Sequence, residues 1–103
     1  CKEIVWAYEQ ALRFDDCGAA LLWLDDAAPV HLRRLQLAAE VGATWAVTFR
    51  PSRFSSQASP AVLRLELQPV DEQGRAPSTR TEIDITVLKA RGARAGGCYR
   101  VQL

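Results

Sequence analysis

Two aspartates, Asp25 and Asp26, are the residues of this chain best placed for chemistry, because they directly follow the apolar run 19–24. An acid at the end of a buried strand is how many nucleotide-hydrolysing proteins present a carboxylate to magnesium. That chemistry also needs a glycine-rich phosphate loop of the form GxxxxGK[ST], which the sequence lacks. Asp25 and Asp26 are therefore weak candidates for a nucleotide site, and capping of a helix that begins near Pro29 explains them equally well.

A second candidate lies in the polar segment 50–60, where Arg50 and Arg53 accompany Phe54. Two cations beside an aromatic ring could hold single-stranded nucleic acid by charge and stacking. The alternative is a solvated loop with Phe54 turned back onto the core. The sequence leaves both interpretations open.

A third candidate is a group of basic residues near the end of the chain, with glycines between them. Such a group could contact a DNA backbone or an acidic protein partner, although a solvated hairpin end is the simpler interpretation. Its members are Lys89, Arg91, Arg94 and Arg100.

The three tryptophans differ in their expected positions. Trp23 and Trp45 fall inside predicted strands and are expected in the core. Trp6 falls off the apolar stripe of the first predicted helix, and exposed tryptophan is enriched in interface hot spots. We therefore treat Trp6 as a candidate partner-binding residue.

The elements that must position these residues begin with a helix, a strand, a helix and a strand. Apolar residues at three- and four-residue spacing predict a helix over 2–14. Residues 19–24 are apolar without alternation, which is typical of a parallel strand covered on both faces. A helix from near Pro29 to Gly42 and a strand over 43–49 complete a parallel crossover unit.

Three strands follow, because the sequence alternates at period two over 62–67, 82–88 and 98–103. Turn-rich segments separate these strands, which predicts an antiparallel meander that extends the parallel sheet. The expected fold class is α/β, with helices packed on the sheet. One domain is expected over residues 1–103.

Composition gives weaker constraints on function. The chain is 49% hydrophobic and 24% charged with a net charge of +1, which is typical of a soluble globular domain without a general attraction to nucleic acid or membranes. Three cysteines without a CxxC pair and one histidine predict free thiols, no metal and no cofactor. We expect a cytoplasmic protein, and the absence of methionine suggests a fragment of a longer chain.

Several short sequence segments resemble the C-terminal part of a RecA-type core. The resemblance covers nearly the whole chain. Within that superfamily the strings 18–24 and 32–40 are similar to the ImuA family of RecA-like accessory proteins in bacterial damage-induced (SOS) mutagenesis. SulA-like cell-division inhibitors share the tryptophan-bearing strand and the next helix, but typically end soon after the strand at 43–49. Residues 85–91 and 99–103 resemble the last hairpin of the RecA-type core.

The resemblance implies a non-catalytic adaptor in translesion DNA synthesis, with an ImuB-like polymerase-family protein and RecA as partners. It also implies possible weak DNA contact, and oligomers through RecA-like or edge-strand contacts. One departure is the strand end Thr48-Phe49-Arg50-Pro51, where recombinases place a glutamine that couples nucleotide state to DNA binding. Two alternatives remain: a SulA-like inhibitor of the tubulin-like division protein, and a RecA-type ATPase whose phosphate loop lies outside this sequence.

Overall fold

The computed structural model describes residues 2–14, 16–70 and 81–103. Its internal contacts divide the chain into two compact units, Cys1–Pro60 and Ala61–Leu103. Cys1, Asp15 and most of the turn-rich connection expected between Pro69 and Thr81 lie outside the described residues.

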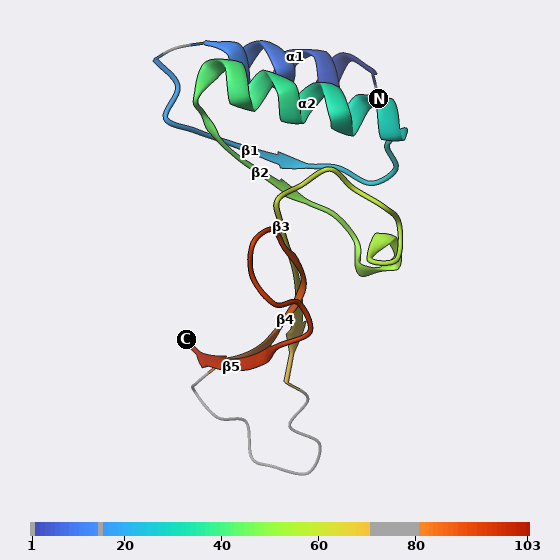
Figure 1. Ribbon diagram of the computed structural model, residues 1–103, viewed down its shortest axis with the longest axis vertical. Helices are drawn as coiled ribbons and strands as arrows, with labels where there is room; N and C mark the ends of the chain where they lie inside the picture. Colours follow the sequence, from blue (N-terminus) through green and yellow to red (C-terminus); the bar gives the residue numbers. More distant parts are fainter. Residues whose placement is uncertain (1, 15, 71–80) are drawn as a thin grey trace. The chain divides into compact units, whose positions relative to one another are not determined.

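The first unit contains the helix, strand, helix and strand predicted from periodicity (Figure 1). β1 and β2 pair in parallel, with Ala19 opposite Trp45 and Trp23 opposite Phe49, which confirms the parallel crossover. The elements are α1 (Lys2–Arg13), β1 (Ala19–Trp23), α2 (Pro29–Gly42), β2 (Trp45–Phe49) and the short 3-10 helix η1 (Ser52–Phe54).

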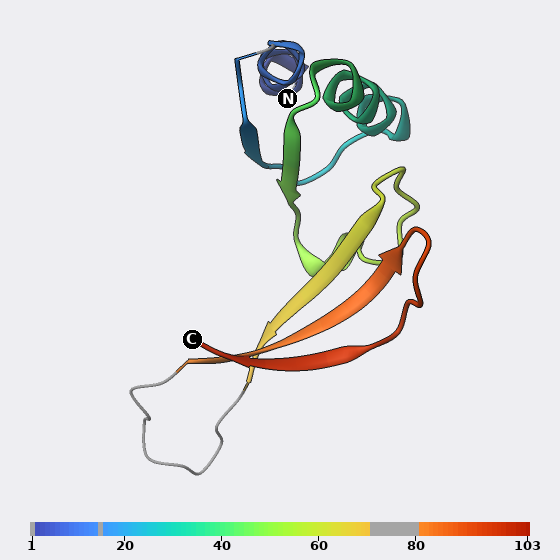
Figure 2. The same ribbon diagram turned by 60° about the vertical axis from the view of Figure 1, so that its left-hand side comes forward.

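Both helices of this unit lie on the same side of the two-stranded sheet (Figures 1 and 2). Tyr8 of α1 ties this layer to the sheet, because its hydroxyl lies 2.9 Å from the carbonyl oxygen of Ala20 and 3.1 Å from that of Val47. The buried core comes from α1, β1, α2 and the segment between β1 and α2: Val5, Tyr8, Leu12, Leu22, Leu24, Ala27, Leu32, Leu35 and Ala38.

The C-terminal end of α2 packs closely against α1. Gly42 is buried there, and a Cβ atom at this position would overlap the backbone carbonyl of Leu12. The next residue, Ala43, ends the helix in the left-handed region with φ of 50°. Thr44 is buried beside this contact, with its hydroxyl 3.0 Å from the carbonyl oxygens of both Leu12 and Cys17. The glycine predicted as a helix end therefore also permits the close approach of two helices.

The expectation of a sheet covered on both faces is wrong for this unit. Its helices lie on one face, where Leu22 is buried, and the large side chains of the other face are exposed: Leu21 by 52%, Trp23 by 69%, Trp45 by 71% and Phe49 by 40%. Trp23 and Trp45 are consequently not core residues. An uninterrupted apolar run shows that both faces are apolar, but it does not supply the layer that would bury the second face.

The expectation that Asp25 or Asp26 caps the second helix is also wrong. The residue at the N-cap of α2 is Ala28, which makes no side-chain capping bond, and Pro29 occupies the first turn. The aspartates lie two and three residues before that cap, so their carboxylates do not cap the first backbone N–H groups. The fixed φ of proline, which suits a first helical turn, marks the start instead.

The second unit is the antiparallel meander predicted from the alternating segments. β4 pairs with both β3 and β5. The register places Leu67, Ile85 and Tyr99 side by side on one face, and Gln68, Asp84 and Arg100 on the other. The face with Leu67 is apolar and the opposite face is polar. The strands are β3 (Leu63–Pro69), β4 (Glu82–Ala90) and β5 (Cys98–Gln102).

The meander does not extend the parallel sheet, as the sequence had suggested. The described strands form two sheets, β1-β2 and β3-β4-β5. A segment bounded by Pro51 and Pro60 separates β2 from β3 and contains η1. Periodicity identifies each strand but carries no information on which strands join one ladder.

Candidate functional site

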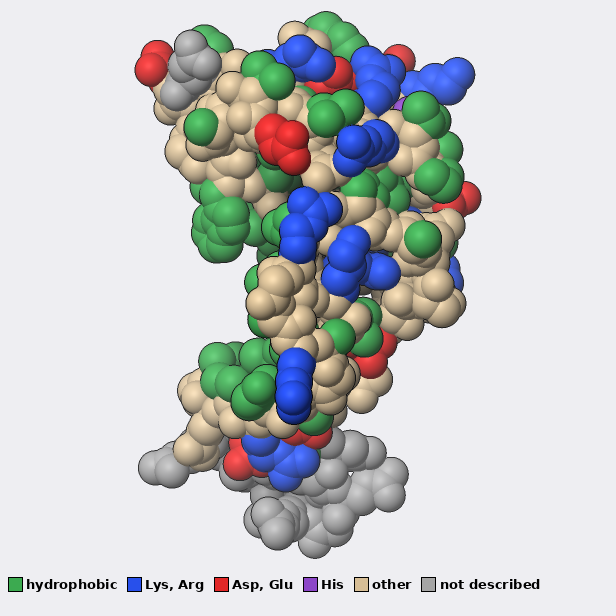
Figure 3. Space-filling view, in the orientation of Figure 1, with side chains coloured by type: hydrophobic (Ala, Val, Ile, Leu, Met, Phe, Trp, Pro, Cys, Tyr) green, Lys and Arg blue, Asp and Glu red, His purple; other side chains and the backbone are tan. Residues whose placement is uncertain are grey.

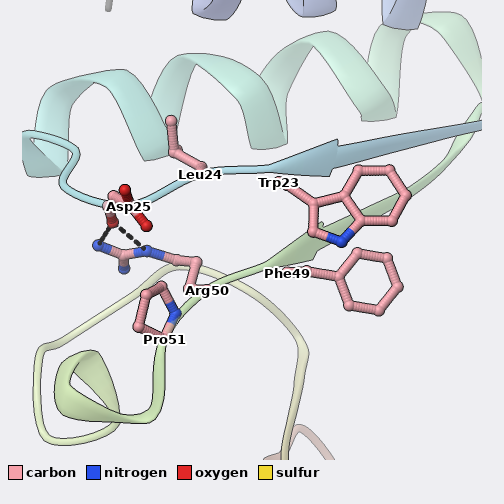
Figure 4. A pocket seen from close by; sticks show the side chains of 6 residues that line it. All are labelled: Trp23, Leu24, Asp25, Phe49, Arg50 and Pro51. Atoms are coloured by element: carbon pink, nitrogen blue, oxygen red, sulfur yellow. Dashed lines mark hydrogen bonds between the residues drawn. The ribbon is translucent and has the colours of Figure 1, made fainter.

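The carboxyl ends of β1 and β2 meet around a shallow hollow with a volume of about 380 Å³ (Figure 4). Ligands of parallel α/β folds typically bind at this end of the strands. Trp23 and Phe49 stack at one side, with ring centroids 5.0 Å apart and an angle of 18° between the rings. The hollow is lined by Trp23, Leu24, Asp25, Phe49, Arg50 and Pro51.

Arg50 closes the other side of this hollow and joins the two strand ends. Its guanidinium donates hydrogen bonds to the backbone carbonyl of Asp25, at 3.2 and 3.3 Å, and to Oε1 of Gln57, at 3.0 Å. The backbone N–H of Leu24 donates to the carbonyl of Phe49 at 2.9 Å, so the pairing of the strands continues to this point. The arginine that departs from the recombinase pattern therefore has a structural role.

The surroundings of Asp25 include a cation of the chain itself. Both Asp25 and Asp26 are exposed, and the guanidinium of Arg50 is held at the backbone of Asp25. A fixed cation at this place disfavours a second cation. Within residues 2–14, 16–70 and 81–103, no three His, Cys, Asp or Glu side chains are grouped so that they could hold a metal ion.

The candidate nucleic-acid clamp of the loop after β2 is built around the ring of Phe54. The guanidinium carbons of Arg50 and Arg53 lie 4.5 and 4.8 Å from the centre of the Phe54 ring. Phe54 is half-buried. The three residues are thus brought together, but the ring already stacks with the cations of the chain itself, which competes with a nucleobase for the same ring.

Trp6 lies on the surface, as its position off the apolar stripe predicted, and is 61% exposed. It borders a smaller hollow of about 200 Å³ between α1 and α2. In the lining of this hollow, the buried carboxylate of Glu9 accepts hydrogen bonds from Arg34 at 2.8 Å and from Arg13 at 3.3 Å. The lining residues are Lys2, Val5, Trp6, Glu9, His31 and Arg34.

The basic residues of the meander do not form one cluster. Arg100 pairs with Asp84 on the neighbouring strand, at 2.8 and 3.1 Å. Lys89 lies five residues farther along β4, a distance of about 17 Å in a strand, and faces Arg64 of β3. Exposed Arg91 and Arg94 occupy the turn after β4. The structure separates Arg100 from the other three and adds Arg64 beside Lys89.

The Asp84–Arg100 pair shifts the ionisation of both groups. Hydrogen bonds from the Arg100 guanidinium hold the pKa of the Asp84 carboxyl below its usual range, and the same bonds raise the pKa of Arg100. Both side chains are exposed to solvent screening, so the pair sets local charge more than stability.

Sequence reasoning missed two of these features. The first is the ion pair of Glu9, although its spacing of four from Arg13 is typical of a helical ion pair. Its contact with Arg34 depends on the packing of α2 and has no sequence signal. The facing positions of Asp84 and Arg100 followed only from the register of β4 and β5.

Two further observations concern the cysteines and the length of the apolar helices. Cys17 and Cys98 are free thiols, and Cys1 lies outside the described residues. In the part of the chain that the structure describes, no helix is both long and apolar enough to cross a bilayer.

These sites of the described residues offer exposed aromatic rings and ion pairs. Comparison with known protein families, with curated proteins and with solved structures finds no match to this chain.

Proposed function

We propose that this chain is a protein–protein interaction module of the ImuA type, a non-catalytic adaptor in damage-induced (SOS) translesion DNA synthesis. Its proposed partners are an ImuB-like polymerase-family protein and RecA. The observation that carries the interaction role is Trp6, a large aromatic side chain that is 61% exposed on α1. A tryptophan at the edge of a hollow with a polar rim matches the composition of interface hot spots.

The surroundings of Trp6 support this role. Buried Val5 lines the hollow beside it, together with Lys2, His31 and Arg34. The Glu9 carboxylate fixes Arg34 on one side, so less side-chain freedom is lost when a partner binds. A partner that buries the indole and places acidic groups beside the basic rim would fit this surface.

The RecA-like ancestry in this proposal rests on the resemblance of local strings together with the order of elements. The order of elements, a parallel strand–helix–strand unit followed by an antiparallel meander, supports the assignment, whereas the division of the described strands into two sheets does not. The described strands β3 to β5 favour this assignment over a SulA-like inhibitor, whose sequences typically end earlier.

Binding without turnover is supported by the position of Arg50. An ATPase of this class needs Asp25 or Asp26 to act on magnesium, whereas the guanidinium of Arg50 is bound at the backbone of Asp25. The positive charge of the Arg50 guanidinium disfavours the binding of magnesium beside Asp25. The ATPase alternative is accordingly less well supported than the adaptor.

Direct DNA contact would be a secondary property of the same adaptor. Arg91 and Arg94 are exposed in the turn between β4 and β5, where a phosphate backbone could reach them. Two cations release few counterions, so such binding would be weak and would fall only modestly as the salt concentration rises.

The test is retention of the purified polymerase-family partner and of RecA by the immobilised chain, with and without Trp6→Ala. We expect the substitution to weaken retention by about tenfold or more, because a central interface tryptophan typically contributes about 2 kcal/mol or more. Val41→Ala is the matched control, since Val41 is an apolar residue of α2 that is 71% exposed outside the Trp6 hollow. Equal retention by wild type and Trp6→Ala would remove Trp6 as the contact.

A further inference from the structure

The outer face of the β1–β2 sheet is a second apolar surface, distinct from the Trp6 hollow. Both helices lie on the opposite side of the sheet (Figure 1). The register of the parallel pair sets Ala19 beside Trp45, Leu21 beside Val47 and Trp23 beside Phe49. All six side chains are apolar, and hydrophobic side chains are visible at the surface in Figure 3.

We propose that this outer face is the interface between two copies of the chain, packed sheet against sheet. The lack of charge on this face is compatible with a second copy as the occupant. None of the six positions carries a charged or polar side chain, so a second copy meets no like-charge repulsion, and no charge pattern selects a different partner. A face this apolar resembles interfaces between identical subunits more than it resembles transient ones.

Surface area supports the same occupant. Trp23 and Trp45 are about seven-tenths exposed and Phe49 is 40% exposed. With about 250 Å² for each indole and about 200 Å² for the phenyl ring, these residues offer about 400 Å² per copy. A standard interface buries about 800 Å² per partner, so the aromatic rings would supply about half of it.

The geometry of a sheet face suits a two-fold arrangement. Two sheets pack face to face at about 10 Å with interdigitated side chains, and a two-fold axis uses the same surface on both copies. The Trp23–Phe49 stack, with ring centroids 5.0 Å apart, presents a preformed aromatic surface at one end of the face. Trp45 lies at the other end, opposite Ala19. This arrangement uses the sheet face and leaves the strand edges unused.

Sedimentation equilibrium of the chain over a range of concentrations, under reducing conditions, tests the proposal. We expect a reversible monomer–dimer equilibrium for the wild type, and a shift to monomer for Trp45→Ser and for Trp23→Ser. Trp6→Ser is the matched control, because it removes an equally exposed tryptophan from a different surface and should leave the dimer intact. Circular dichroism of each variant verifies that the helices remain.

Tryptophan fluorescence gives a second measurement that needs no variant. Two of the three indoles lie on the proposed interface, so emission should shift to the red as the wild type is diluted and the dimer dissociates. A wild type that stays monomeric, or that forms a ladder of larger aggregates, would overturn the proposal. A dimer lost in Trp6→Ser but kept in Trp45→Ser would also overturn it. The proposal would also be overturned if the wild type is monomeric and Trp45→Ser weakens capture of the polymerase-family protein. The outer face of the sheet would then bind that partner.

Discussion

Tyr8 shows how one residue joins three elements of the first unit. It is buried on α1, and its hydroxyl lies within hydrogen-bonding distance of a carbonyl of β1 and a carbonyl of β2. Burial raises the pKa of the Tyr8 phenol above its ordinary value, because the charged phenolate loses solvation. The neutral phenol is therefore the form that the folded unit requires.

The first prediction concerns stability at alkaline pH. A raised pKa in the folded state contributes stability that is present below the ordinary value of about 10 and is lost as pH rises through the higher folded value. Tyr8→Phe should reduce the free energy of unfolding near neutral pH by about 1 kcal/mol, through the lost hydrogen bond. It should also flatten the decline of that free energy above about pH 10. Denaturant titrations at several pH values check both effects, and equal alkaline slopes in the two proteins would contradict the assignment.

Gly42 leads to the second prediction. Replacing a helical glycine by alanine normally stabilises a helix by about 1 kcal/mol. Here the added methyl group would overlap the Leu12 carbonyl, so α1 and α2 must separate. We expect Gly42→Ala to lower the free energy of unfolding by about 1 to 3 kcal/mol, as overpacking typically does.

The neighbouring residue supplies a control of opposite sign. Ala43 has φ of 50°, where a Cβ atom is unfavourable and glycine is not. Ala43→Gly should therefore leave stability unchanged or raise it. Thermal unfolding of both variants checks the pair, and a more stable Gly42→Ala protein would show that the two helices are not in close contact.

At the scale of elements, the Asp84–Arg100 ion pair joins β4 and β5 of the meander. The third prediction is that Arg100→Gln raises the pKa of the Asp84 carboxyl back toward its ordinary range, because the hydrogen bonds from Arg100 are the main cause of its depression. A depressed carboxyl pKa contributes stability that is present above about pH 3.9 and is lost as pH falls through the lower folded value. Titration of the Asp84 carboxyl by NMR in both proteins measures the shift, and an unchanged pKa would contradict the pairing.

The elements themselves could be predicted from the sequence, and their surroundings could not. The spacing of Val5, Tyr8 and Leu12 identified α1, and alternation identified the three strands of the meander. The exposure of Trp23 and Trp45 was missed because an apolar strand does not reveal how many layers cover it. The start of α2 near Pro29 was predicted correctly, but the capping role of Asp25 or Asp26 was not, because acids and a proline close together are both typical of a helix start.

The candidate sites were predictable to a similar degree. The exposure of Trp6 followed from its angle on the helix, since it falls outside the apolar stripe. The contacts of Arg50 with the Asp25 backbone and with Gln57 join residues 25 positions and seven positions apart. Contacts of that kind depend on how strands and loops come together, and no local pattern encodes them.

At the scale of the whole molecule, each unit carries exposed apolar surface. The first unit has the Trp6 hollow and the outer face of its sheet, and the second has an apolar meander face with Leu65, Leu67 and Tyr99 exposed. Extended apolar surface on a small protein typically marks sites of association. Association is therefore the property on which the proposed adaptor role depends.

The most direct test of the adaptor role is a calorimetric titration of the purified polymerase-family partner into the wild type, Trp6→Ala and Val41→Ala. We expect saturable binding by the wild type, a dissociation constant about tenfold or more higher for Trp6→Ala, and a value within about twofold of wild type for Val41→Ala. Circular dichroism should show the same helix content in all three proteins. The absence of saturable binding by the wild type, or equal affinity for wild type and Trp6→Ala, would contradict the account.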